Sequence, residues 1–142
     1  LRGANSRVWV VLGDGECQEG QIWETAMLAS RYQTDNLHAV VDVNGFQECR
    51  WPPPHRPSAP PVDNLAERWK AFGWQVWTVG GHDHRDLCRV LAAAAAASTQ
   101  PSVVLALSRK GKGFPLIEAN PLRFHCTTVT DAEHATLLRS LP

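Results

Sequence analysis

Several features that would assign this chain of 142 residues to a membrane, nucleic-acid-binding or disulfide-rich class are missing from its sequence. No segment approaches the roughly 20 apolar residues that a membrane helix needs. The formal net charge is zero, with 14 basic and 14 acidic side chains, so electrostatics points neither to nucleic acid nor to an anionic membrane surface. The four cysteines form no CxxC pair, which favours reduced thiols in a cytoplasmic protein.

The first residues also lack the features of a secreted precursor. Residues 1–5 contain no apolar segment of the kind found in signal peptides, and there is no initiator methionine. We therefore expect the chain to begin inside a longer protein. Its composition, 44% hydrophobic and 20% charged, is typical of a soluble globular protein, and the length suits a single domain spanning residues 1–142.

Hydrophobic periodicity predicts an alternation of strands and helices. Short apolar, β-branched runs indicate strands, the first of them a buried one, over residues 7–12, 37–43, 74–79 and 102–107. Helical spacing and capping residues indicate helices over residues 19–32, 63–72 with Asp63 as cap, 84–98 with Asp83 as cap, and 131–141. This order predicts an α/β fold with a mostly parallel sheet flanked by helices.

A proline-rich stretch interrupts this alternation. Residues 51–61 contain six prolines, which exclude both a helix and a central strand. We predict a stiff loop there, or a cover over another part of the protein.

Polar residues follow the first two predicted strands. The first strand ends at Gly13-Asp14-Gly15 and the second at Asp42-Val43-Asn44-Gly45. If these strands are neighbours, Asp14 and Asn44 emerge at the same edge of the sheet, where ligands bind in such folds. A carboxylate and an amide oxygen suit Mg²⁺ or Ca²⁺, with phosphate oxygens completing the coordination shell. The glycines and the start of the next helix would favour an anion.

The string GDGECQEGQIWETAMLASRYQTDNLHAVVDVNGFQ, residues 13–47, closely resembles transketolases, above all the amino-terminal subunits of split transketolases. Later elements also fall where the family has similar ones: Phe72-Gly73-Trp74, Gly81-His82-Asp83, Lys110-Gly111-Lys112-Gly113, and Asn120-Pro121 with His125. The resemblance implies a thiamine-diphosphate-binding fold that is incomplete at its amino-terminal side.

The resemblance also implies a cofactor, thiamine diphosphate with Mg²⁺ or Ca²⁺. Asp14 and Asn44 would bind the metal through their side chains and Phe46 through its backbone carbonyl. Gly13 and Gly15 belong to the diphosphate-binding turn, with the Gly15 N–H as a donor.

Two further residues are implied to be catalytic. Glu19 matches a carboxylate at the subunit interface that takes part in proton relay between paired active sites. His125 matches a histidine that reaches towards the diphosphate and the substrate. Neither role follows from spacing alone, since an acid in the first turn of a helix is also favoured by the helix dipole.

By the same resemblance, the chain would contribute to transfer of a two-carbon ketol unit from a ketose, such as a sugar phosphate, to an aldehyde. Its partner would be a subunit carrying the pyrimidine-binding and carboxy-terminal domains, in a dimer or heterotetramer. Two alternatives stay open: a non-catalytic relic that binds a partner, and a two-carbon transferase to a carrier-bound thiol.

Other residues depart from the family or carry ambiguous signals. Cys126 stands where a glycine usually follows the histidine, and Leu107-Ser108 stands where many members have Lys-Thr. His82 and His84 form an HxH pattern without partners at zinc-site spacing, which favours a structural role. Lys110 and Lys112 either meet phosphate or are solvated.

Overall fold

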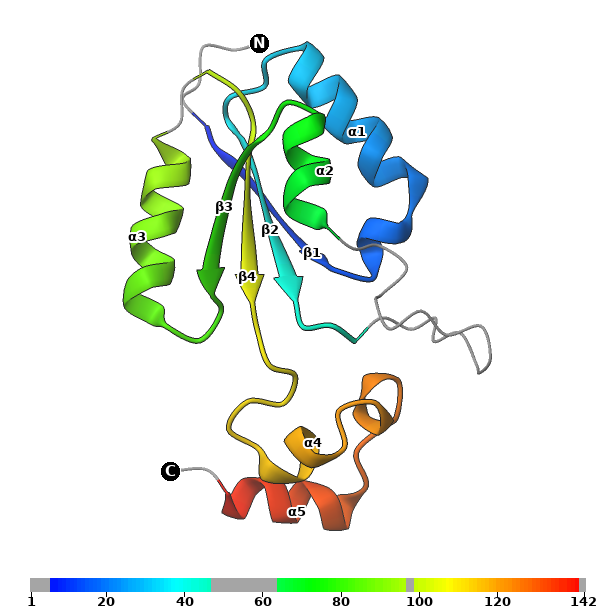
Figure 1. Ribbon diagram of the computed structural model, residues 1–142. Helices are drawn as coiled ribbons and strands as arrows, with labels where there is room; N and C mark the ends of the chain where they lie inside the picture. Colours follow the sequence, from blue (N-terminus) through cyan, green and yellow to red (C-terminus); the bar gives the residue numbers. More distant parts are fainter. Residues whose placement is uncertain (1–5, 47–63, 97–98, 141–142) are drawn as a thin grey trace.

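A computed structural model of the protein describes residues 6–46, 64–96 and 99–140. Its elements follow the chain in the order β1 (Val8–Gly13), η1 (Glu16–Gln18), α1 (Gly20–Arg31), β2 (Leu37–Val43), α2 (Leu65–Ala71), β3 (Gln75–Gly80), α3 (His84–Ala95), β4 (Ser102–Leu107), α4 (Pro115–Ala119), η2 (Arg123–His125) and α5 (Asp131–Arg139) (Figure 1). Strands and helices alternate up to β4, and only helices follow it.

The four strands form one parallel sheet in the order β1-β2-β4-β3. In the register of the sheet, Gly13 pairs with Asp42, Asp42 pairs with Ala106, and Gly80 pairs with Leu107. All four carboxyl ends therefore lie at one edge of the sheet. The predicted α/β fold with a mostly parallel sheet and flanking helices is confirmed.

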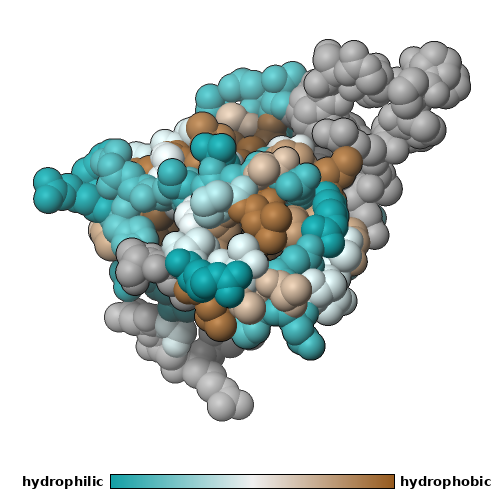
Figure 2. Space-filling view, turned by 90° about the horizontal axis from the view of Figure 1, so that it is seen from below, coloured by the Kyte–Doolittle hydropathy of each residue, from teal (hydrophilic) through white to brown (hydrophobic). Residues whose placement is uncertain are grey.

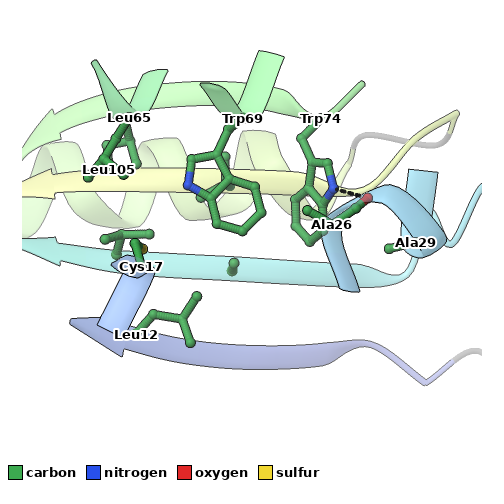
Figure 3. Packing of buried hydrophobic residues seen from close by; sticks show 11 residues of the cluster. Leu12, Cys17, Ala26, Ala29, Leu65, Trp69, Trp74 and Leu105 are labelled. Carbon is green, nitrogen blue, oxygen red and sulfur yellow. Dashed lines mark hydrogen bonds between the residues drawn. The ribbon is translucent and has the colours of Figure 1, made fainter. Parts of the chain in front are cut away.

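Helices cover both faces of the sheet, with α1 and α2 on one side and α3 on the other (Figure 1). The core under α1 and α2 contains Trp69 and Trp74, whose ring centroids lie 4.7 Å apart, together with small residues of α1 such as Ala26 (Figure 3). The indole N–H of Trp74 donates to the carbonyl of Ala26 at 3.0 Å. Small residues on α1 thus let two large rings fill the space between helix and sheet.

The second core lies between α3 and the opposite face. Val79, Val90, Ala94 and Val104 are its buried members. Asp83 caps α3 as predicted, since its carboxylate accepts from the backbone N–H of Asp86 at 3.0 Å. Alanine in the second half of the helix keeps α3 close to β3 and β4.

The first strand differs from its prediction as a buried strand. Val8, Trp9, Val10 and Val11 are all exposed, Val11 to 74%. The reason is topological, because β1 is one of the two outer strands of the described sheet while β4 lies inside it. Of the apolar positions predicted for the first helix, Met27 is also exposed.

Several boundaries also differ from the predictions. The N-cap of α2 is Asn64, in the left-handed region at φ 51°, and not Asp63, which lies outside the described residues. The helix predicted over residues 19–32 corresponds to α1 alone, with Glu19 as its extended N-cap residue, and the 3₁₀ turn η1 that precedes it was not predicted. The helices predicted to reach residues 98 and 141 end at Ala95 and Arg139. The proline-rich stretch 51–61 lies outside the described residues.

The carboxy-terminal helices form a unit beyond the carboxyl ends of the strands (Figure 1). Sequence periodicity missed α4 and η2 because each is too short for a helical repeat to show. A capping box at Thr130 and Glu133 starts α5. The Arg123 guanidinium hydrogen-bonds to Glu133 and, with Thr130, lowers the pKa of that carboxyl to about 2. This pair ties η2 to α5.

Viewed from the side of the carboxy-terminal helices, the surface is mainly hydrophilic, with apolar residues in separate patches (Figure 2). Over the described ranges, no helix is both long and apolar enough to cross a membrane.

Candidate functional site

The candidate site lies where β1 and β2 end. β1 stops at Gly13, and the next backbone N–H, that of Asp14, donates to the carbonyl of Asp42 at 3.1 Å. This bond extends the pairing of the two strands by one residue. After β1 and after β2 the chain turns away from the sheet, so Asp14 and Asn44 lie at the same edge.

Asp14 is a buried carboxylate, 3% exposed. One of its oxygens accepts from the N–H of Gly15 at 3.0 Å, and the other accepts from the N–H of Gly45 at 2.9 Å. The second bond joins the turn after β1 directly to the turn after β2. Because a carboxylate can accept about four hydrogen bonds, lone pairs remain for a cation.

The buried thiol of Cys17 lies close enough to Asp14 and Glu16 for their negative charges to affect its pKa. Burial, and then the negative charges of Asp14 and Glu16, raise the pKa of the Cys17 thiol to about 12. The thiol therefore stays protonated, as expected for a structural cysteine. The same negative field would favour a cation beside Asp14.

The side-chain amide of Asn44 is bonded to one hydrogen-bond donor and one acceptor. Its Oδ1 accepts from the backbone N–H of Phe46 at 2.8 Å, and its Nδ2 donates to Asp42 Oδ2 at 2.9 Å. The other oxygen of Asp42 accepts a hydrogen bond from the hydroxyl of Ser108, in the segment that follows β4. The carboxylate of Asp42 thereby connects the ends of β2 and β4.

Sequence reasoning assigned no role to Asp42 and noted Ser108 only as a departure from the family. The available signal was the spacing Asp42-Val43-Asn44, which puts two polar side chains on the same face at the end of a strand. The contribution of Ser108 had no local signal, because it stands 66 residues after Asp42.

The turns leave open space beside the backbone. A Cβ atom built on Gly13 or on Gly45 would have no neighbour within 4 Å, and Gly45 has a positive φ of 76°. Glu16 accepts from the N–H of Gly13 at 3.1 Å. The edge thus combines free space beside two glycines with a buried carboxylate.

The residues predicted to be catalytic lie on different parts of this edge. Glu19 is exposed at the start of α1, where its carboxylate contacts the side-chain amide of Gln21. His125 belongs to η2, in the unit beyond the strand ends. Its Nδ1 is buried and has no hydrogen-bond partner within the described ranges. The catalytic roles of both residues stay predictions.

A basic turn, residues 109–114, follows β4 at the same edge. Glu118 closes it by accepting from the N–H of Gly113 at 2.8 Å and by pairing with Arg109 at 2.8 Å. Gly111 is required there, since its φ is 77° and a Cβ would lie 2.3 Å from a methyl group of Ile117. The turn that carries Lys110 and Lys112 is therefore fixed in shape.

The HxH pattern has a structural use in this arrangement. His82 accepts from the backbone N–H of Arg109 through Nε2 at 2.7 Å and so links the segments after β3 and β4. Across residues 6–46, 64–96 and 99–140, no group of three or more His, Cys, Asp or Glu side chains could hold a metal. Any metal at the strand ends would therefore need the mixed set that Asp14 and Asn44 offer, completed by carbonyl and ligand oxygens. Such a set fits Mg²⁺.

Comparison with known proteins assigns this arrangement to a family. Residues 3–141 match the family described as "Transketolase, thiamine diphosphate binding domain", so the chain belongs to the transketolase family and represents this domain. The match extends over both the sheet and the carboxy-terminal helices.

Individual relatives agree with this assignment. The chain is 39% identical over 118 residues to transketolase-like protein 2 of Bos taurus, covering 83% of this chain and 18% of the relative. It is 38% identical over 116 residues to the transketolase of Homo sapiens, covering 81% and 17%. It is 37% identical over 106 residues to the 6-deoxy-6-sulfo-D-fructose transketolase subunit SqwG of Clostridium sp. (strain MSTE9), covering 75% and 37%. The chain thus spans about a fifth to a third of these relatives.

Solved structures show the same fold. A Pichia stipitis transketolase in complex with xylulose 5-phosphate superposes with a TM-score of 0.68 at 25% identity, covering 78% of this chain and 16% of the other. The transketolase of Campylobacter jejuni gives a TM-score of 0.68 at 22% identity, covering 82% and 17%. The described sheet and helices therefore form the fold of a transketolase thiamine-diphosphate domain.

Proposed function

We propose that this chain binds the diphosphate of Mg²⁺–thiamine diphosphate at the carboxyl ends of β1 and β2. The chain thereby takes part in transfer of a two-carbon ketol unit. The observation that carries this proposal is the hydrogen bond from the Gly45 N–H to Asp14, which joins a buried carboxylate at the end of β1 to the residue that follows Asn44 at the end of β2. Family membership supports the choice of cofactor.

In the proposed site, Asp14 and Asn44 hold Mg²⁺ through their side-chain oxygens, and Phe46 contributes its carbonyl. Asp14 is already oriented by two backbone N–H groups, so it loses little conformational entropy on binding the metal. The open space beside Gly13 leaves room for an anion to approach the backbone of this turn. Ca²⁺ fits the same oxygen ligands.

When bound, thiamine diphosphate supplies the chemistry that breaks and forms the carbon–carbon bond. This chain holds the cofactor by its charged end and orients it. In the proposed roles, Glu19 relays protons at a subunit interface and His125 reaches towards diphosphate and substrate. The exposure of Glu19 leaves its carboxylate available to another chain.

The complete reaction is proposed to need more polypeptide than this chain. The chain spans 18% of a full-length transketolase-like relative and 37% of a relative named as a subunit. We propose that a subunit with the pyrimidine-binding and carboxy-terminal domains completes the site, in a dimer or heterotetramer. The donor is proposed to be a ketose, such as a sugar phosphate, and the acceptor an aldehyde.

Calorimetric titration of Mg²⁺–thiamine diphosphate into the natural assembly that contains this chain tests the proposal. Asp14→Ala should abolish magnesium-dependent binding. The matched control is Asp86→Ala, which removes a half-exposed carboxylate from α3 and should leave the affinity unchanged. Equal affinities of Asp14→Ala and the unsubstituted protein would rule out the metal assignment.

A further inference from the structure

We propose that Asp42 is a positioning residue that fixes the side-chain amide of Asn44 in one orientation, with its oxygen available to the metal. Ser108 in turn holds Asp42 in place. This inference rests on the proposed function, because it concerns how one proposed metal ligand is presented. Asp42 itself is not proposed to touch the metal.

The argument begins with the symmetry of an asparagine amide. Its oxygen and nitrogen occupy nearly equal volumes, so a rotation by 180° exchanges an acceptor for a donor at little steric cost. A cation binds only the oxygen. An Asn ligand therefore presents a metal-binding atom in one of its two orientations, and the surrounding groups decide which one is populated.

Both neighbours of Asn44 favour the same orientation. An ionised carboxylate accepts but cannot donate, so Asp42 Oδ2, at 2.9 Å, requires the amide nitrogen on its side. A backbone N–H donates but cannot accept, so the Phe46 N–H, at 2.8 Å, requires the oxygen on the other side. The reversed amide would face a repulsive contact on each side. The charged contact with Asp42 is the stronger of the two constraints.

Asp42 can act in this way because it is itself immobilised. Its backbone pairs with Gly13 on one side and with Ala106 on the other, at the end of β2. Its second carboxylate oxygen accepts a hydrogen bond from the Ser108 hydroxyl. The N–H of Ser108 donates to the Val43 carbonyl at 3.1 Å, which fixes the serine beside the strand end. Both oxygens of Asp42 are therefore used to hold neighbours.

The consequence for binding is preorganisation. Asn44 Oδ1 accepts one hydrogen bond from Phe46 and keeps a second lone pair for a cation. The metal then finds the oxygen already in place, instead of selecting one of two amide orientations. Groups that orient metal ligands typically contribute about 10- to 100-fold to metal affinity.

The test measures Mg²⁺ affinity by calorimetry at saturating thiamine diphosphate, in the natural assembly that contains this chain. Asp42→Asn should weaken Mg²⁺ binding by about 10- to 100-fold, because a neutral amide at position 42 accepts either orientation of Asn44. The double variant Asp42→Asn with Asn44→Asp should recover most of the lost affinity, since a carboxylate offers oxygen in both orientations. The single variant Asn44→Asp is the reference, because an added carboxylate strengthens Mg²⁺ binding by its charge alone. The positioning role predicts that Asp42→Asn lowers the affinity much less in the Asn44→Asp background than in the unsubstituted protein, whereas a merely structural role predicts equal losses.

The outcomes separate this inference from the proposed function. If the unsubstituted protein does not bind Mg²⁺–thiamine diphosphate, the proposed function fails. If Asp14→Ala abolishes binding but Asp42→Asn keeps full affinity, or if Asp42→Asn costs the same affinity with and without Asn44→Asp, the positioning role is wrong and the proposed function stands. Should Asp42→Asn not fold, Ser108→Ala replaces it. Ser108→Ala is expected to weaken Mg²⁺ binding less than tenfold, and unchanged affinity would overturn the inference.

Discussion

The neighbouring strands β2 and β4 are joined by a pair of polar side chains at each of their ends, and the two pairs have different roles. At the carboxyl end, Asp42 accepts from Ser108 and from Asn44, and every oxygen of its carboxylate has a partner. At the amino end, His38 and Ser102 pair in register, with 2.8 Å between Nδ1 and Oγ. Both of these residues are buried, and the His38 ring lies against Trp9 at a centroid distance of 4.5 Å.

The difference between the ends lies in what the pairs hold. Asp42 bonds to the side chain of Asn44 beside Gly13 and Gly45, where a Cβ would meet no neighbour within 4 Å, so its hydrogen bonds serve a proposed ligand site. His38 is closed in, and its Nε2 has no partner in the part of the chain that the structure describes. Similar pairs between the same strands thus support a proposed ligand site at one end and packing at the other.

The largest expected effect on stability comes from the amino end. His38→Ala should lower the free energy of unfolding by about 2 to 5 kcal/mol, because it opens a cavity under Trp9 and leaves the Ser102 hydroxyl without its partner. Urea unfolding measures this change. The affinity for Mg²⁺–thiamine diphosphate of the folded variant should not change, and a parallel loss of affinity would show that the two ends are coupled.

A matched pair of serine substitutions sharpens the comparison. Ser102→Ala removes a buried hydroxyl from His38 and should cost about 1 to 2 kcal/mol of unfolding free energy without an effect on binding. Ser108→Ala is the same chemical change at the carboxyl end, where the hydroxyl is only half-buried, and should act on Mg²⁺ affinity instead. Identical profiles for both variants would contradict the division between the two ends.

The amino end should also make stability depend on pH. Burial, and then the positive charge of Arg7, lower the pKa of His38 below its usual value of about 6.5, while Asp35 partly opposes this shift. The unfolded chain therefore binds a proton at a higher pH than the folded protein does. Stability should be full above about pH 6.5 and should fall as the pH drops below it. Thermal unfolding from pH 8 to pH 5 measures this loss.

The control for this pH dependence is His134→Gln, which removes an exposed histidine from α5. Between pH 8 and pH 5 this variant should lose as much thermal stability as the unsubstituted protein does. His38→Gln should lose less stability over the same pH range. An unchanged profile in His38→Gln would exclude His38 as the source.

The smallest effect on stability is expected for an exposed ion pair that takes part in neither the Asp42–Ser108 pair nor the His38–Ser102 pair. Arg89 and Asp86 form an exposed i,i+3 ion pair on α3 at 3.1 Å. Arg89→Ala should change the free energy of unfolding by only about 0.2 to 0.5 kcal/mol, since solvent screens the pair. A larger change in urea unfolding would mean that surface charge contributes as much as the buried pairs.

Local signals predicted most of the elements in the sheet. The boundaries of β2 and β4 agree with the predicted strands 37–43 and 102–107, since each is a short apolar run bounded by turn residues. The Asp83 cap of α3 is also local chemistry, a side chain bonded three residues ahead. Even the meeting of Asp14 and Asn44 at one edge followed from parallel strands joined through a helix.

Burial was less predictable than the elements themselves. The run Val8–Leu12 and the run Ser102–Leu107 are similarly apolar, yet Val11 is 74% exposed while Val104 is fully buried. The amino-acid composition of the two runs therefore does not tell which strand is buried. Only the strand order in the sheet distinguishes an outer strand from an inner one.

By itself, the sequence determined the alternation of strands and helices, the glycine turns that end β1 and β2, and the membership in the transketolase family, which the match over residues 3–141 shows. Only the tertiary structure decided that Ser108 meets Asp42 across 66 residues and that Ser102 meets His38 across 64. The physical reason is that hydrophobic periodicity fixes the face on which a side chain lies, whereas the neighbour and register of a strand depend on how the whole sheet packs.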